Sequence, residues 1–246
     1  MSIIHDNSTS ASGTTASLVF SHQIIGGANL YLTVATMCDT GNVTPGVSGV
    51  TYAGVAMTLL ATTEDAYLEA KLWGLKAPAL GTNNVVVTVS ASRPVMACAS
   101  SRKNVDQTTS TRTPAGASAS GTLSTVTPTT IAGDVVVDVL CMGVPLTNLA
   151  VGAGQTARFL NDDANPPEGG SSDETAIGAS TAMTWSWTTT RWWFAAAVPL
   201  IPGPVPGGGP MWWFYANKWK DFLRDVKRGL VPPGVLRRQY QDLTAI

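Results

Sequence analysis

The chain has little charge and few reactive side chains. Only 13% of its 246 residues are Asp, Glu, Lys or Arg, and it has two histidines and three cysteines. With 44% hydrophobic residues, this composition excludes a disordered chain and is sufficient for a sizeable core. The net charge of −1 excludes a protein that binds nucleic acid through overall positive charge, so we expect no nucleic-acid partner.

The chain also lacks the residue patterns of common active and metal sites. No GxSxG, P-loop, HExxH or CxxC pattern occurs, and these patterns mark frequent catalytic and ligand-binding sites. Ser21 precedes His22, but neighbours along a strand point to opposite faces and cannot pair as nucleophile and base. We therefore expect no enzymatic activity and no cofactor.

The three cysteines, Cys38, Cys98 and Cys141, are far apart in apolar stretches. An odd number of cysteines without close spacing argues against a disulfide framework. We therefore predict that each cysteine is a small, buried hydrophobic residue of the core. No run of about 18 apolar residues occurs, so we predict no transmembrane helix. The first residues, MSIIHDNSTSASG, have neither the basic nor the apolar region of a secretory signal, so we expect none.

Short segments rich in Val and Thr, with a period of two, fill residues 17–201. Turn residues such as Gly26-Gly27 separate them, as is typical of antiparallel hairpins. About ten short strands without a helix-period segment predict an all-β fold, an antiparallel β-sandwich of jelly-roll or immunoglobulin-like topology. No internal repeat of about 20–50 residues is evident.

Alternation within residues 66–75 predicts a strand with one wet face. Leu68, Ala70 and Leu72 share one face, and Glu69 and Lys71 share the other. Because one face of an antiparallel sheet commonly meets water, we expect the two charged side chains to be exposed.

Four tryptophans crowd the last predicted hairpin: Trp185, Trp187, Trp192 and Trp193. The first two share one face of a strand, whereas the last two face opposite ways. Since only one face can be core, we expect at least one indole to be exposed or covered by something else. A sugar-stacking platform is the alternative to core packing.

Acidic residues gather in residues 161–174. The candidate ion ligands are Asp162, Asp163, Glu168 and Asp173. Clustered carboxylates can hold Ca²⁺, but the EF-hand spacing fails, because Glu168 stands where that loop requires Gly when counted from Asp163. We expect a solvated acidic loop and no metal, with an irregular Ca²⁺ site as the alternative.

The pattern divides the chain into four parts. We predict an N-terminal arm over residues 1–16, the sandwich over 17–201, a Gly/Pro linker over 202–210 and a helical docking tail over 211–246. Apolar residues recur every three or four positions in the tail, which predicts an amphipathic helix. The tail carries seven basic and three acidic residues, or +4, whereas the rest carries eight basic and thirteen acidic residues, or −5.

The predicted helix offers an apolar face and a basic face to a partner. Its candidate anchors are Trp212, Trp213, Phe214, Trp219, Phe222 and Leu223, and its basic side chains are Lys218, Lys220, Arg224, Lys227 and Arg228. Large aromatic anchors dominate binding energy, and surrounding charges steer association, here toward an acidic partner. Alternatively, the tail folds back onto its own sandwich.

Four pieces of the chain match the recurring pieces of a known protein module. They are residues 50–58 (VTYAGVAMT), residues 73–81 (WGLKAPALG), Gly133-Asp134 before a Val-rich strand, and Trp185-Ser186 near the end. Together, residues 17–201 resemble a β-sandwich module of tailed-bacteriophage proteins and bacterial secreted proteins. The resemblance implies a sandwich fold and no catalytic residues. Because no secretory signal is visible and no disulfide is expected, it favours the phage version.

The leading hypothesis is therefore a structural virion protein of a tailed bacteriophage, assembled in the host cytoplasm. We expect a capsid decoration or cement protein, or a head-surface accessory protein, anchored through its termini. Its partners would be other virion proteins, the major capsid protein first, and copies of itself. The alternatives are a tail or fibre module that binds host glycans and a membrane-surface binder that uses the basic aromatic helix.

Overall fold

The computed structural model describes residues 1–42, 44–143, 148–161 and 167–204. The chain divides into two units, residues 1–203 and 204–246, and the following account concerns the first. Within the described residues, every regular element is a strand and all strand pairs are antiparallel, which confirms the all-β prediction. The predicted helical tail, residues 211–246, lies outside the described residues.

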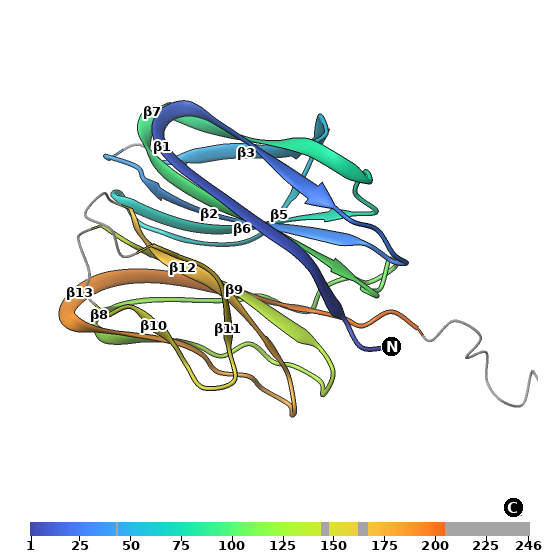
Figure 1. Ribbon diagram of the computed structural model, residues 1–246. Coiled ribbons are helices and arrows are strands. Elements are labelled where there is room, and N and C mark those ends of the chain that lie inside the picture. The colour runs from blue at the N-terminus through green and yellow to red at the C-terminus, as the bar shows by residue number, and fades with distance from the viewer. Residues whose placement is uncertain (43, 144–147, 162–166, 205–246) are drawn as a thin grey trace, which may run out of the picture. The chain divides into compact units, whose positions relative to one another are not determined.

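Seven strands form the first sheet (Figure 1). Their order is β4-β3-β7-β2-β6-β5, and β1 also pairs with β7. The strands are β1 (Ile4–Ile24), β2 (Tyr31–Asp39), β3 (Val47–Tyr52), β4 (Val55–Ala56), β5 (Thr58–Glu64), β6 (Leu68–Lys76) and β7 (Gly81–Lys103).

Six strands form the second sheet. Their order is β10-β13-β9-β12-β11, and β8 also pairs with β13. The strands are β8 (Ala115–Val126), β9 (Val135–Met142), β10 (Ala150–Val151), β11 (Thr156–Asn161), β12 (Glu168–Thr175) and β13 (Met183–Leu200).

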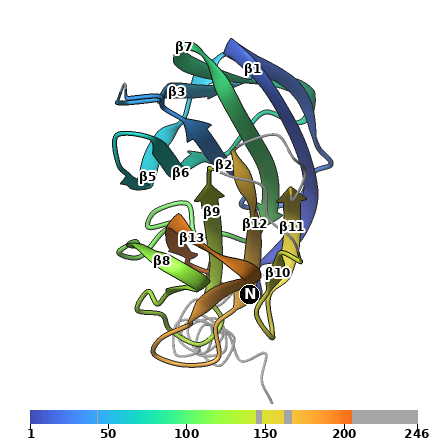
Figure 2. The same cartoon turned by 90° about the vertical axis from the view of Figure 1, so that its left-hand side faces the viewer.

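The predicted N-terminal arm is wrong, because residues 4–16 are the first half of β1. This half pairs with β7 from Ile4 opposite Lys103 to Thr15 opposite Arg93, and Figure 2 shows β1 running beside β7. Main-chain hydrogen bonds to β7 therefore order a segment made mainly of Ser, Thr, Ala and Gly. Such a segment has no apolar alternation, which is the signal that identifies strands in a sequence.

A central apolar layer joins the two sheets. It includes Met37 and Met96 from the first sheet and Cys141 and Phe194 from the second. The sheets thus pack face to face as a β-sandwich, with alternate residues of β2, β7, β9 and β13 pointing into this layer.

The opposite face of each sheet is buried as well. In the first sheet, Val34, Trp73 and Val87 belong to a second apolar cluster, enclosed where the sheet curls and carries β3 over β2 and β6. In the second sheet, Leu140 and Trp193 belong to a third cluster. Strands β2, β7, β9 and β13 each contribute to two clusters, because both of their faces are buried.

The two sheets share one topology. Replacing β1, β2, β3, β5, β6 and β7 by β8, β9, β10, β11, β12 and β13 turns the pairing of the first sheet into that of the second. The registers also correspond: Met37 lies opposite Met96 on β7, and Cys141 lies opposite Phe194 on β13.

The irregularities repeat too. The β5–β6 ladder shifts register between Leu59 and Ala61, and the β11–β12 ladder shifts between Ala157 and Phe159. The body is therefore built from two topologically equivalent halves, one on each side of the central layer.

The predicted wet face of β6 is wrong. Glu69 and Lys71 are buried inside the curled first sheet, where the Lys71 ammonium lies 2.7 Å from the Glu69 carboxylate. That carboxylate also accepts the N–H groups of Gly46 and Val47, at 2.9 Å each. Burial raises the pKa of Glu69, opposed by the hydrogen bonds from Lys71 and Val47. Alternation in the sequence identifies the polar face of a strand. It does not show whether that face is exposed to water or buried with its charges paired.

A second buried ion pair connects the two sheets. The guanidinium of Arg102 on β7, 1% exposed, lies 2.6 Å from the carboxylate of Asp173 on β12. Arg158 on β11 donates two further hydrogen bonds of 2.8 Å to Asp173. Burial acts to raise the pKa of Asp173, but the two guanidinium groups outweigh burial and hold this pKa below its ordinary value.

The second half shows what can replace Arg102, because Leu200 stands at the corresponding position of β13. We predict that Arg102→Leu lowers the free energy of unfolding by about 3 kcal/mol, since Asp173 keeps only Arg158 in a buried site. Urea denaturation measures this change. The double variant Arg102→Leu, Asp173→Asn should recover most of the loss, and a wild-type midpoint for the single variant would contradict this account.

Candidate functional site

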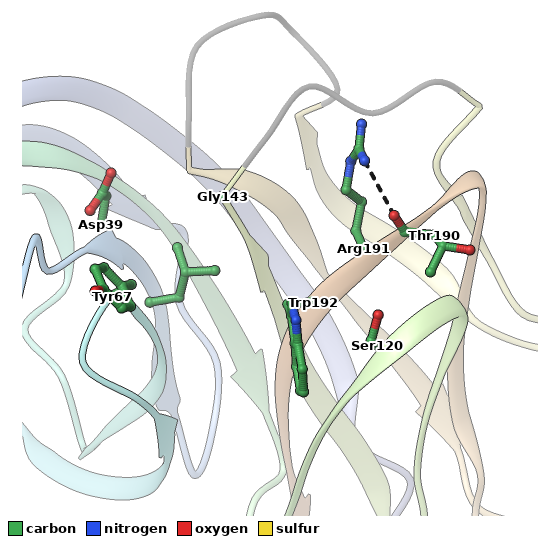
Figure 3. A pocket seen from close by; sticks show the side chains of 8 residues that line it. Asp39, Tyr67, Ser120, Gly143, Thr190, Arg191 and Trp192 are labelled. Atoms are coloured by element: carbon green, nitrogen blue, oxygen red, sulfur yellow. Dashed lines mark hydrogen bonds between the residues drawn. The ribbon is translucent and has the colours of Figure 1, made fainter.

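A groove of about 440 Å³ lies at the seam between the two halves. Asp39, Tyr67 and Leu68 line it from the first half, and Ser120, Gly143, Thr190, Arg191 and Trp192 line it from the second (Figure 3). Asp39 is the last residue of β2, and Gly143 directly follows β9. The groove is thus formed where these two facing strands end together.

Local hydrogen bonds shape the first-half side of the groove. The Asp39 carboxylate accepts the N–H of Gly41 at 3.0 Å. The Asp65 carboxylate accepts the N–H groups of Tyr67 and Leu68 at 2.7 and 2.8 Å, a turn that positions Tyr67 before β6. The phenol ring of Tyr67 remains exposed.

The four tryptophans of β13 separate as the alternation predicts. Trp185, Trp187 and Trp193 are at most 5% exposed, whereas Trp192 is 65% exposed. The indole N–H of Trp185 donates to Asp138 at 2.7 Å, and that of Trp187 donates to the Gly121 carbonyl at 3.1 Å. Core packing is confirmed for three indoles, and the fourth lines the groove.

The duplicated topology shows that the fold does not require Trp192. Strands β7 and β13 shift register against β1 and β8 at the same place, before Arg93 on β7 and before Arg191 on β13. The next residue is Pro94 in the first half and Trp192 in the second. The same backbone geometry therefore forms without an aromatic residue, so the indole adds a surface that the architecture does not need.

The predicted acidic loop is wrong from Glu168 onward, because Glu168–Thr175 is strand β12. Glu168 is buried, and the carboxylate of Asp173 turns inward to two guanidinium groups rather than toward a cation. Asp162 and Asp163 lie outside the described residues. Across the described ranges, no three His, Cys, Asp or Glu side chains gather as a metal site.

The predicted tail residues also lie outside the described part of the chain. These are the anchors Trp212, Trp213, Phe214, Trp219, Phe222 and Leu223 and the basic residues Lys218, Lys220, Arg224, Lys227 and Arg228. Their role as a docking surface stays a prediction.

His22, near the end of β1, has a structural role. His22 is fully buried, with its ring nitrogens 2.8 Å from the Thr9 hydroxyl and 3.2 Å from the Ser101 hydroxyl. Burial lowers the pKa of His22 to about 4, so the ring stays neutral. Ser21 instead donates to the side chain of Asn84, as expected for a residue that points to the other face.

The cysteines are buried and free, as predicted. Burial raises the pKa of Cys38 and Cys98 to about 12, and that of Cys141 further still. A thiol with so high a pKa is a poor nucleophile near neutral pH. The three side chains therefore act as core residues.

Asp138 is the carboxyl group that burial perturbs most clearly. Burial raises its pKa to about 7, although Ser172 and Trp185 donate hydrogen bonds to it. An aspartate in an unfolded chain titrates near ~3.9. From about pH 4 to pH 7 the folded state therefore holds a proton that the unfolded state has lost, and this group makes stability fall as pH rises.

His22 acts in the opposite direction, because its lowered pKa makes stability rise over much of the same interval. The comparison of wild type with Asp138→Asn isolates Asp138. We predict that the wild-type free energy of unfolding, minus that of the variant, falls by up to about 4 kcal/mol between pH 4 and pH 7. Urea denaturation at several pH values measures it, and a pH-independent difference would contradict the protonated state of Asp138.

Neither a protein-family model nor a curated protein sequence matches the chain. These comparisons neither support nor contradict the resemblance of residues 17–201 to a phage β-sandwich module. Within the residues that the structure describes, no helix has the length and apolar character needed to span a membrane.

Proposed function

We propose that the protein is a non-enzymatic structural protein of a tailed-bacteriophage particle. In this proposal residues 211–246 attach to a neighbouring virion protein, and the β-sandwich projects from the attachment point. The role is that of a capsid decoration or cement protein, or of a head-surface accessory protein. The partners are other virion proteins, the major capsid protein first, and copies of the chain itself.

The observation that carries this proposal is the position of the two chain ends of the sandwich. The Met1 ammonium donates to the Gly203 carbonyl at 3.3 Å, and the Gly203 N–H donates to the Asn104 carbonyl at 2.7 Å. The Asn104 side chain in turn donates to the Ser2 carbonyl at 3.0 Å. The N-terminus and the exit to the C-terminal segment thus lie together, as Figure 1 shows.

The groove lies at the other end of the same strands. Tyr31, the first residue of β2, pairs with Arg102 near the chain ends, whereas Asp39, its last residue, lines the groove. Likewise, β9 begins at Val135 opposite Leu200 and ends beside the groove. Attachment through the termini would leave the groove end of the sandwich free, an arrangement that suits a protein displayed on a particle.

The interior of the sandwich fits a passive, rigid role. Both faces of each sheet are covered by apolar clusters, and the buried charges Glu69 and Arg102 are paired with Lys71 and Asp173 inside the fold. The sequence places the aromatic anchors beyond the exit at Gly203, after a Gly/Pro linker. In this proposal, the predicted Gly/Pro linker gives the amphipathic segment the reach to contact a neighbouring subunit.

Particles that lack the protein provide the test. Full-length chain, a variant that ends at Pro210, and the double variant Trp212→Ala, Trp219→Ala are mixed with such particles and sedimented. We expect full-length protein to co-sediment at saturating occupancy, the truncated chain to remain in the supernatant, and the double variant to bind at least about tenfold more weakly, a loss of about 1.4 kcal/mol.

Ile177→Ala is the matched control, because Ile177 is an apolar side chain, 92% exposed, on the sandwich itself. It should bind like the unmodified chain. Full occupancy by the truncated chain would show that the tail is not the anchor, and failure of the full-length chain to bind any head or tail particle would contradict the proposed function.

A further inference from the structure

We propose that the groove at the seam of the two halves is a binding site for a short, uncharged saccharide. The proposal concerns the sandwich alone and does not depend on attachment to a particle. It rests on the exposed aromatic rings, the polar groups beside them, the charge balance of the lining and the comparison between the two halves.

Two aromatic side chains are exposed on opposite sides of the groove. Trp192 comes from β13 and Tyr67 from the turn before β6, as Figure 3 shows. Single exposed apolar side chains are common on protein surfaces, but exposed aromatic rings that line the same groove can mark a ligand-binding site. An aromatic ring with a polar atom at its edge suits a ligand that is apolar on one face and polar at its rim, and a sugar ring has this character.

Polar side chains surround the rings. The Asp39 carboxylate uses one oxygen for the N–H of Gly41, and a carboxylate can accept about four hydrogen bonds. The Arg191 guanidinium donates to the Thr190 carbonyl at 3.3 Å and has further donors, and Ser120 adds a hydroxyl. Sugar hydroxyl groups both donate and accept, so they can pair with all three side chains.

The charge and size of the groove favour a neutral small ligand. Its lining has one carboxylate, Asp39, and one guanidinium, Arg191, so no net charge attracts a polyanion. A volume of about 440 Å³ is typical of small-molecule sites, which span roughly 300–1,000 Å³. A protein partner would need a contact area of roughly 800 Å² on each side, more than such a groove presents by itself.

The groove residues Trp192 and Asp39 have different counterparts at the equivalent positions of the other half. Pro94 stands in place of Trp192, and Gly143 on the second half corresponds to Asp39 on the first. The groove therefore combines residues that differ between the equivalent halves. Since the same fold forms with Pro at one position and Gly at the other, neither the indole nor the carboxylate is needed for folding.

The experiment uses the full-length chain. It is applied to an array of neutral oligosaccharides that contain glucose, galactose, mannose or N-acetylhexosamine, printed beside sialylated and sulfated ones. The neutral oligosaccharide retained most strongly is then titrated by calorimetry against wild type, Trp192→Ala, Asp39→Asn and the control Ile177→Ala, and thermal unfolding verifies that each variant is folded.

We expect the wild type to retain neutral oligosaccharides in preference to acidic ones. Trp192→Ala should weaken the affinity by at least about tenfold, Asp39→Asn should weaken it by a smaller factor because its oxygen still accepts the Gly41 N–H, and Ile177→Ala should leave it unchanged. Retention of acidic oligosaccharides alone, no retention of any neutral one, or equal affinity of wild type and a folded Trp192→Ala would overturn the proposal.

Discussion

Burial of both faces of each sheet is the constraint on which the rest of the structure depends. Each sheet contributes one face to the central layer, and each covers its other face with its own strands, so β7 and β13 must bend where their register against β1 and β8 shifts. Several charged residues on the strands of both sheets are therefore buried. Glu69 pairs with Lys71, Arg102 pairs with Asp173 across the sheets, and burial raises the pKa of Asp138 to about 7.

The sequence predicted what depends on local alternation. The strands of residues 17–201 and the exposure of at least one indole on β13 follow from a period of two, and the burial of the cysteines follows from their spacing and apolar surroundings. The sequence-based predictions were wrong where the structure depends on pairing between strands that are far apart in the chain. The ladder to β7 orders residues 4–16, which have no apolar alternation, and the curl of the first sheet buries Glu69 and Lys71. Asp173 belongs to a strand because β9 and β11 lie on either side of it.

The candidate site was visible in the sequence only through its indole. Tyr67 and Asp39 join Trp192 because the end of β2 meets the end of β9 across the central layer, a contact between segments about a hundred residues apart. The two topologically equivalent halves could not be recognised in the sequence for a related reason. Corresponding positions carry different residues, such as Pro94 and Trp192, while strand order and register are retained. Packing volume and backbone pairing tolerate such exchanges as long as the buried pattern persists.

We propose that the β-sandwich is displayed on a phage particle, because its chain ends lie at one end of β2 and β9 and its groove lies at the other. A reconstruction of the phage particle at side-chain resolution tests it most directly. The account predicts residues 211–246 in contact with another virion protein and the Trp192 groove open to solvent on the outward side. A sandwich whose groove end is buried in the particle, with residues 211–246 pointing outward, would contradict it.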